Sequence, residues 1–327
     1  MPDDTETLAN SENSENLVTI GATEAVEATR PKPGRLAVGV VGAGRVGAVL
    51  GASLRRAGHT VVGASGVSEE SVSRIETLLP GVPQLDPESV VRAADLVLLT
   101  VPDDALSELV SGLAAVDAWR PGQIAVHAAG RFGTEVLAAA AQKGVLTLAI
   151  HPAMTFTGTS LDHTRLANAT FAVSAPAGVL PIALALAVEM GGEPIVIADE
   201  DRPAYHAAIC HAANHVVTAV VQSSAVLARL GIEEPGRLLG PVVHASVEGA
   251  LSEAPGAVTT LTGPVVRGDA QTVAAHVAAL SADPDMLHAY VAMARATADL
   301  ALAGQRIGPA QYADLIAALG STGEVMP

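Results

Sequence analysis

Two kinds of residue are scarce in this sequence: aromatic side chains and cysteine. Aromatic residues make up 2% of the 327 residues, and Cys210 is the single cysteine. One cysteine excludes an intrachain disulfide, which suits a reducing compartment. Hydrophobic residues still make up 50% of the chain, so it is long and apolar enough for a globular protein of two domains.

Positive charge is scarce as well. Lys and Arg total 18 against 34 Asp and Glu, which gives a formal net charge of -16 at pH 7. The phosphate backbone of a nucleic acid would be repelled, so we expect no nucleic-acid partner. Any anionic ligand must be held by local hydrogen-bond donors that act against the overall field.

Long hydrophobic runs are missing. Every apolar stretch is interrupted by Gly, Pro or a charged residue well before the ~18 residues that a membrane span needs. The first thirty residues are polar and acidic, and they lack the basic start and apolar centre of a secretory signal. We therefore expect a cytoplasmic protein that has no membrane contact.

The composition and apolar periodicity of the sequence change along the chain. Residues 1–33 are acidic with little apolar periodicity, which predicts a disordered tail. Residues 34–200 alternate strand-like and helix-like segments, one of the expected helices covering residues 133–144. This alternation predicts the α/β class, with a doubly wound, mostly parallel sheet of the Rossmann type.

After residue 198 the strand-like segments stop. Residues 201–322 predict an all-helical, alanine-rich domain that begins with one long helix from Pro203 to Leu230. With few aromatic rings to fill space, these helices must approach closely, and flat apolar faces are left for a partner subunit. We expect this domain to bind substrate and to form the dimer.

A glycine-rich segment, GAGRVG, directly follows the strand-like run LAVGVV and opens a helix. In that context it matches the fingerprint of a dinucleotide-binding turn. The first glycine permits a tight turn, the second lets the backbone approach a pyrophosphate, and the third lets the helix pack on the sheet. An ordinary strand-to-helix turn is the alternative. The predicted cofactor-binding residues here are Gly42, Ala43, Gly44, Arg45, Val46 and Gly47.

The end of the second strand bears on the choice of cofactor. An NAD site usually carries an acidic residue there to hold the ribose hydroxyls, but this chain has Ala64 and Ser65, and no acid before Glu69. Nothing would repel a 2'-phosphate, while Ser65 and Ser68 can donate hydrogen bonds and Arg45 adds positive charge. We therefore predict NADP(H) rather than NAD. The alternative is that these serines only solvate the loop.

Further residues fall at the carboxyl ends of the predicted strands, where ligands bind in such sheets. Two strands end in histidine, at His127 and His151. Buried or capping histidines are common, but we expect at least one of the two to be functional. The predicted cofactor contacts at this edge are Val101, Pro102, Asp103 and His127.

The long helix of the second domain carries a second polar cluster. His206, Cys210 and Asn214 share one stripe by i, i+4 spacing, and His211 and His215 form its neighbour. No Glu lies in the register that a zinc-protease helix needs, so we predict no metal site. Cys210 is interpreted as a small packed residue rather than a nucleophile.

A later loop combines a Gly/Pro turn with polar residues. Asp269 is explained as a helix cap, whereas Thr262 and Arg267 have no such local role. Arg can hold a carboxylate through two parallel hydrogen bonds. We predict that Thr262 and Arg267 bind a small carboxylate substrate.

Taken in series, these motifs resemble a known superfamily. The segments GAGRVG, ADLVLLTVPDD, HAAG, HPAMTF, YHAAICHAANHVV and LTGPVVRGDAQTVAAH are similar to those of the 6-phosphogluconate dehydrogenase, ketopantoate reductase and pyrroline-5-carboxylate reductase superfamily. The similarity is strongest to the branch that joins a Rossmann-like domain to a helical domain of formerly unknown function. The resemblance implies NADP binding and homodimers formed through the helical domain.

The chain departs from the superfamily pattern at two places. Related dehydrogenases carry a catalytic Lys four residues before a helix Asn; Asn214 fits that Asn, but Cys210 takes the place of the Lys. The branch usually has a hydroxyl in the segment that reads HAAG here. The proton donor must then be another group, for which His206 and His151 are the candidates, with Asn214 orienting the substrate.

These features lead to one leading hypothesis with two alternatives. We expect an NADPH-dependent reductase of a small 2-oxo acid, with ketopantoate as the favoured substrate. One alternative is an imine reductase similar to pyrroline-5-carboxylate reductase. The other is a non-catalytic NADP-binding sensor that presents its helical domain to a partner, which the two departures favour.

Overall fold

The computed structural model describes residues 34–252 and 257–320. The tail predicted for residues 1–33 and the last two residues of the predicted helical domain lie outside these ranges. The chain divides into two compact units, with the division between Ile209 and Cys210. Each unit is described by itself below.

The first unit is built on a seven-stranded sheet in the order β2-β1-β3-β4-β5-β6-β7. All neighbouring strands are parallel except β5 and β6, which are antiparallel. The predicted mostly parallel, doubly wound sheet is therefore confirmed. The strands are β1 (Ala37–Val41), β2 (Thr60–Ser65), β3 (Leu96–Leu99), β4 (Ile124–His127), β5 (Leu146–Pro152), β6 (Thr170–Ser174) and β7 (Glu193–Val196).

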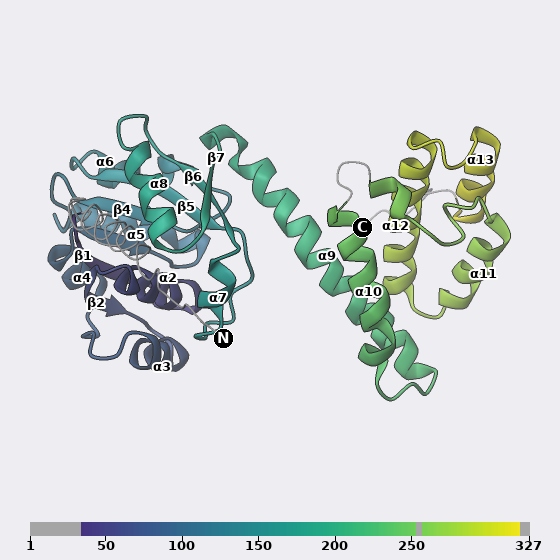
Figure 1. Cartoon of the computed structure of the whole chain (residues 1–327), viewed down its shortest axis with the longest axis horizontal. Helices are drawn as coiled ribbons and strands as arrows, with labels where there is room; N and C mark the ends of the chain where they lie inside the picture. Colours follow the sequence, from purple (N-terminus) through teal and green to yellow (C-terminus); the bar gives the residue numbers. More distant parts are fainter. Residues whose placement is uncertain (1–33, 253–256, 321–327) are drawn as a thin grey trace, which may run out of the picture. The chain divides into compact units, whose positions relative to one another are not determined.

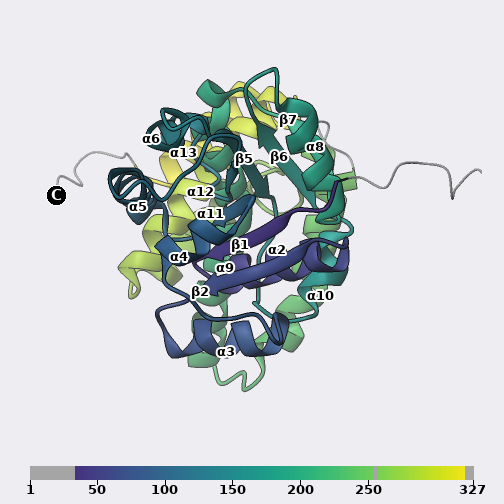
Figure 2. The same ribbon diagram turned by 90° about the vertical axis from the view of Figure 1, so that its left-hand side faces the viewer.

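Helices cover both faces of this sheet, as Figures 1 and 2 show. One face packs against α2 (Arg45–Arg56), α3 (Glu69–Leu78), α7 (Asp162–Leu166) and α8 (Leu180–Glu189). The other packs against α4 (Pro87–Ala93), α5 (Asp103–Ala115) and the short pair η1 (Thr134–Leu137) and α6 (Ala138–Ala141). Because strands such as β3 are buried on both faces, they read as unbroken apolar runs in the sequence.

Local sequence explains where several helices begin. Ser68 caps α3 by accepting from Ser71 N at 3.2 Å, and Asp86 caps α4 by accepting from Ser89 N at 2.9 Å, with Pro87 at the first helical position. The helix expected over residues 133–144 is instead the 3₁₀ turn η1 followed by the single turn α6. An alanine run has high helix propensity, but so short a segment is shaped by its packing.

Helix α9 (Arg202–Arg229) crosses the boundary between the units. It begins one residue before the predicted start at Pro203 and ends one residue before the predicted end. In the second unit follow α10 (Pro235–Ser252), η3 (Ala257–Thr260), α11 (Ala270–Leu280), α12 (Pro284–Ala303) and α13 (Pro309–Ala318). No helix of the described ranges is long and apolar enough to cross a bilayer.

The core of the second unit is made by α11, α12, α13 and the loop before α11. Val273, Ala298 and Leu315 are fully buried there, and Val265 and Val266 of the loop join them. Helix α10 contributes no buried residue, and the only buried residue of α9 is Arg202, which belongs to the first unit. Among residues 34–252 and 257–320, the apolar side chains of these two long helices are thus left largely exposed.

Candidate cofactor and active site

The strand order creates a crevice at one edge of the sheet. Strand β2 lies on one side of β1, and the next strand along the chain, β3, lies on the other side. The carboxyl ends of β1 and β3 therefore form a topological switch point. Gly42 follows β1 and Thr100 follows β3, and the Thr100 hydroxyl donates to Gly42 O at 2.7 Å. The predicted glycine turn therefore lies where open α/β sheets bind ligands.

Two of the three glycines are required by the packing of this turn. Gly42 has φ +88, and a Cβ there would lie 2.9 Å from the Thr100 and Val101 backbone. A Cβ on Gly47 would lie 2.5 Å from Gly42 O and would also collide with the Thr100 hydroxyl. These contacts hold the start of α2 directly against the sheet.

Gly44 has a different reason to be glycine. Its backbone, with φ -72 and ψ -159, suits any residue, and a Cβ there would meet nothing closer than Gly42 O at 4.0 Å. The protein itself does not need a glycine at this position. Gly44 is the residue before α2, where the first N–H groups of the helix have no partner within it and its dipole favours an anion.

Ser65 stabilises the turn from the end of β2. The Gly42 N–H lies 3.2 Å from both the Ser65 carbonyl and its side-chain oxygen, and Ala43 N donates to the same carbonyl at 2.7 Å. Ser65 is 7% exposed. The structure thus gives its side chain a role within the turn, while the 2'-phosphate contact expected of it stays a prediction.

A second arginine lies beside Arg45 that the sequence reasoning missed. A Cβ placed on Gly158 would lie 2.8 Å from Arg45 Cγ and 2.8 Å from Arg74 Nε, so both side chains meet at this glycine. Arg74 lies on α3, which follows the end of β2. The loop that holds Gly158 is fixed by buried Asp162, which accepts from Gly158 N at 2.7 Å and from Thr157 N at 2.8 Å.

The segment after β3 places three of the predicted cofactor residues at the same edge. Val101 is half-buried beside Gly42, and Pro102 precedes the first turn of α5. Asp103 opens that helix, and its carboxylate pairs with Arg131 at 3.1 Å. The Asp103 side chain therefore already has a partner on the loop after β4.

His127, a predicted cofactor contact, lies inside the protein. It is fully buried, its Nε2 lies 2.9 Å from Gly133 O, and its Nδ1 accepts from Ala129 N at 3.2 Å. Burial lowers the pKa of His127 to about 4, so the ring is neutral near pH 7. With both nitrogens bound to backbone, this histidine shapes the loop after β4, and its contact with a cofactor stays a prediction.

The same loop is held at its far end by Asp199. The Asp199 carboxylate accepts from Thr134 N at 2.9 Å and from the Thr134 hydroxyl at 2.8 Å. A Cβ on Gly133 would collide with this carboxylate. Residues 128–134 are thus clamped between His127 and Asp199, and this clamped loop includes the segment HAAG.

His151 and His206 meet beside this loop, whereas the sequence placed only His151 at this sheet edge and His206 in a separate cluster. Their ring centroids lie 6.0 Å apart with planes at 89°. A Cβ on Gly130 would lie 3.0 Å from His151 Nε2 and 2.5 Å from His206 Cδ2. The two candidate proton donors therefore both pack against Gly130 at the carboxyl ends of β4 and β5, where an added Cβ would collide with them.

Tyr205 and Arg202 complete this group, and neither was recognised from the sequence. The Tyr205 hydroxyl lies 2.9 Å from His151 Nδ1. Arg202 is fully buried, its Nε donating to Ser174 Oγ at 2.8 Å and one terminal nitrogen to Ala149 O at 2.8 Å. Burial, reinforced by the positive charge of Arg202, lowers the pKa of His151 to about 4.

The remaining residues of the predicted polar cluster lie on the part of α9 that belongs to the second unit. Asn214 is exposed, and its backbone carbonyl accepts from the Thr218 hydroxyl at 3.0 Å. His211 and His215 contact each other, their Nδ1 atoms 2.9 Å apart. In residues 34–252 and 257–320, no group of three or more His, Cys, Asp or Glu is placed to hold a metal ion.

The predicted substrate residues share one loop of the second unit. Thr262 and Arg267 are both exposed, and Arg267 N donates to Gly263 O at 3.3 Å, which closes the loop between them. Asp269 caps α11 as expected, accepting from Thr272 N at 3.0 Å. The structure brings Thr262 and Arg267 together and leaves their side chains open to solvent.

Two protein families match successive parts of the chain, and the second match begins within the first structural unit, before the division between Ile209 and Cys210. Residues 22–152 match a family described as a Rossmann-like domain, and residues 169–297 match a domain of unknown function, DUF2520. The chain joins a Rossmann-like domain to a DUF2520 domain. This organisation confirms the resemblance that the motifs indicated. Comparison with curated protein sequences finds no match.

Solved structures share the fold of this Rossmann–DUF2520 protein. A provisionally assigned NADP oxidoreductase from Bacteroides fragilis is 21% identical, with a TM-score of 0.68 over 81% of this chain and 98% of its own. An imine reductase from Pseudomonas is 18% identical, with a TM-score of 0.55 over 88% and 100%. Pyrroline carboxylate reductase from Plasmodium falciparum, solved with NADP bound, is 13% identical, with a TM-score of 0.52 over 82% and 100%.

Proposed function

We propose that this protein is an NADPH-dependent reductase of a small 2-oxo or imino acid. The observation that carries the proposal is the occurrence, at one sheet edge, of the glycine turn and of the paired rings of His151 and His206. The similar folds of an imine reductase and a pyrroline carboxylate reductase support the same class. When bound, NADPH would supply a hydride to a carbonyl or imine carbon.

The residues at the turn fit a dinucleotide. Gly44 leaves open space beside the free N–H groups at the start of α2, which suits a pyrophosphate. Arg45 and Arg74 meet at Gly158, and Arg74 lies on α3, the helix that follows β2; at the end of β2 an NAD site would carry an acid. In a chain of net charge -16, two adjacent arginines are the local donors that a 2'-phosphate requires. This supports NADP(H) over NAD.

The proton that the reduction consumes would come from the histidine pair. The hydride leaves negative charge on the substrate oxygen or nitrogen, and a group within hydrogen-bond reach must neutralise it. His206 and His151 both lie against Gly130 at this sheet edge. Asn214 would orient the substrate, and Thr262 and Arg267 would hold its carboxylate.

The test is a direct comparison of substrates. Purified protein is mixed with NADPH and either ketopantoate or pyrroline carboxylate, and NADPH oxidation is followed by absorbance. We expect turnover of ketopantoate, with pyrroline carboxylate as the second candidate. Turnover that survives substitution of both His206→Ala and His151→Ala would exclude the histidines as donors.

A non-catalytic role is the second candidate. Cys210 stands where related dehydrogenases have a catalytic Lys, and Ala128 and Ala129 stand where the branch usually has a hydroxyl. Both changes remove groups that would help chemistry and leave the glycine turn intact. Tight NADPH binding without turnover of either acid would favour such a sensor.

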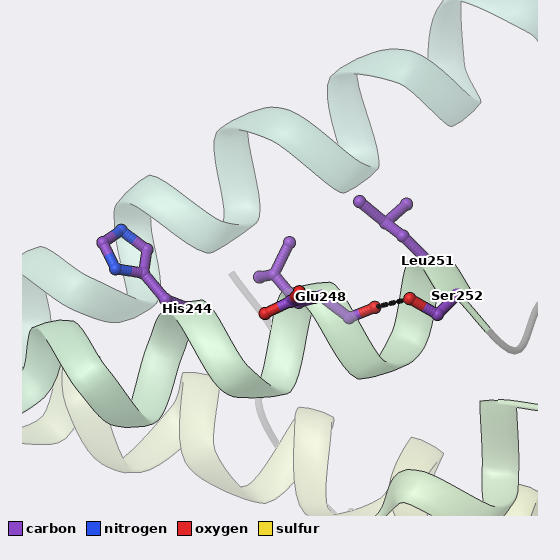
Figure 3. A pocket seen from close by; sticks show the side chains of 5 residues that line it. His244, Glu248, Leu251 and Ser252 are labelled. Carbon is purple, nitrogen blue, oxygen red and sulfur yellow. Dashed lines mark hydrogen bonds between the residues drawn. The ribbon is translucent and has the colours of Figure 1, made fainter. Parts of the chain in front are cut away.

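We also propose that two copies pair through α9 and α10. The exposed apolar side chains of these helices include Val217 and Val221 on α9, each 62% exposed, and Val242 on α10, 63% exposed. A groove of ≈ 240 Å³ runs between the helices, lined by Val216, Val220 and Leu239 among others. A second hollow of ≈ 480 Å³ lies on α10 between His244 and Ser252 (Figure 3). Contiguous apolar surface of this kind is typical of a protein interface.

A further inference from the structure

Tyr205 is placed to act on His151 rather than on a substrate. Its hydroxyl lies 2.9 Å from His151 Nδ1, and the two rings meet edge to face with centroids 5.7 Å apart. A tyrosine hydroxyl carries one proton, and a neutral imidazole has one nitrogen that accepts and one that donates. If Tyr205 donates to Nδ1, the proton of His151 must lie on Nε2.

The Nε2 side of His151 faces Gly130. A Cβ on Gly130 would lie 3.0 Å from His151 Nε2, and on the other side it would meet the His206 ring. Tyr205 and Gly130 therefore lie at opposite ring nitrogens of His151, whose side chain is partly exposed. A group that reaches Nε2 would receive a hydrogen bond from the nitrogen that Tyr205 does not use.

Arg202 is the charged group nearest this pair on α9. It is three residues before Tyr205 and fully buried, and one of its terminal nitrogens, Nη1, has no hydrogen-bond partner within residues 34–252 and 257–320. Burial raises the pKa of Tyr205, and the positive charge of Arg202 opposes that rise. A negative charge on the Tyr205 oxygen would therefore form beside a buried, incompletely paired guanidinium.

We propose that Tyr205 is the source of the proton that His151 passes to the substrate, and that Arg202 stabilises the tyrosinate left behind. This inference rests on the proposed reductase function and specifies how its proton is delivered. It also assigns the Nε2–H tautomer to His151, with Tyr205 as the hydrogen-bond donor.

The proton transfer balances without any further reactant. As the substrate oxygen or nitrogen gains negative charge, its new bond to hydrogen forms with the proton of His151 Nε2. The Tyr205 O–H bond breaks at the same time, and that proton moves to His151 Nδ1. His151 stays neutral throughout. After product leaves, Nδ1 returns its proton to the Tyr205 oxygen and Nε2 takes a proton from water, which restores the starting state.

The surroundings of His151 disfavour a positively charged imidazolium at this position. Arg202, His206 and His127 face it from α9 and β4, and each disfavours a second proton on the ring, as burial does. Burial lowers the pKa of Arg202, and Tyr205, Asp199 and Glu135 oppose that fall. A neutral histidine that relays a proton avoids forming an imidazolium in this place.

Nitrogen NMR of the histidine rings tests the assignment without any turnover. In the full-length protein labelled with ¹⁵N, we expect His151 to carry its proton on Nε2, and the Tyr205→Phe variant to shift Nδ1 toward the value of an unbonded acceptor. Tyr290→Phe is the matched control, because the Tyr290 hydroxyl lies 2.9 Å from His276 Nδ1 in a similar edge-to-face pair. That control should move His276 and leave His151 unchanged. A proton on His151 Nδ1 in the parent protein would overturn the proposal.

Kinetics test the consequence for the reaction. Tyr205→Phe should lower kcat at least tenfold, with NADPH affinity unchanged, whereas Tyr312→Phe, whose hydroxyl contacts Asp299 at 2.7 Å, should keep the parent kcat. Full kcat in Tyr205→Phe would overturn the relay while leaving the reductase intact. No turnover by the parent protein would overturn the reductase and the catalytic role of the relay together, and the NMR result would still decide whether Tyr205 donates to His151.

Discussion

Replacing Gly44 with alanine separates ligand binding from folding at the glycine turn. Gly44 has an ordinary backbone conformation, and an added Cβ would find only Gly42 O, at 4.0 Å. The alanine restricts the unfolded chain, which raises the free energy of unfolding by about 0.4–1 kcal/mol. Alanine is also less favourable than glycine at the residue before the first helical turn, which lowers the free energy of unfolding by about as much. The free energy of unfolding should therefore change by less than about 1 kcal/mol, which is a shift in Tm of at most about 4 °C.

NADPH binding should respond very differently to the same change. The methyl group would occupy the space in which a pyrophosphate approaches the first N–H groups of α2. We expect Gly44→Ala to weaken NADPH binding at least tenfold, which is about 1.4 kcal/mol. Calorimetric titration with NADPH and a thermal melt of the same preparation measure both effects.

Two further alanine variants serve as controls. Gly47→Ala places its Cβ 2.5 Å from Gly42 O and against the Thr100 hydroxyl, so the turn must shift. This overpacking should cost about 1–3 kcal/mol. Gly112→Ala, in α5 with nothing within 4 Å of the added Cβ, should leave NADPH binding unchanged. If Gly44→Ala binds NADPH as the parent does, no phosphate lies against this turn and the cofactor assignment fails.

Three other changes test separate parts of the molecule. Arg74→Gln should weaken NADPH binding more than NADH binding, because only NADPH carries the 2'-phosphate; an equal loss for both would refute the Arg45–Arg74 site. For His127, whose pKa is about 4 when folded against 6.5 as its ordinary value, the unfolded chain binds more protons between these pH values, so stability is lost as pH falls. This histidine should account for about 2 kcal/mol of the free energy of unfolding that is lost between pH 7 and pH 5. Urea unfolding at both pH values should show that the free energy of unfolding of His127→Gln falls by about 2 kcal/mol less than that of the parent. Val217→Glu should convert a dimer to monomers in light scattering; a parent protein that is already monomeric would contradict the α9–α10 pairing.

The sheet could be predicted from sequence because its signals are local. A buried parallel strand must be apolar on both faces, and segments such as Leu96–Leu99 meet that need without ambiguity. The glycine turn follows a strand and opens a helix within a few residues. The single helix predicted over residues 133–144 was wrong because the structure of this segment depends on contacts from other parts of the chain. His127 and Asp199 bind Gly133 and Thr134 there.

The site was only partly accessible to the same reasoning. Strand ends could be assigned to one edge, which brought His151 to the right place, but a histidine that ends a strand carries no sign of which groups its nitrogens meet. His127 and His151 look alike in sequence, yet the first is bound by backbone on both sides. Arg74 and Tyr205 were missed because the places of their side chains depend on the tertiary packing of α3 and α9.

The clamp on residues 128–134 limits how this protein can be redesigned. A stretch pinned by a buried imidazole at one end and a carboxylate at the other has little freedom to lengthen or bulge. Libraries that randomise it to alter substrate preference would mostly return chains that do not fold, because Gly130 and Gly133 each abut neighbouring side chains. New specificity is better sought at Thr262 and Arg267, whose side chains face water and can change at small cost to folding.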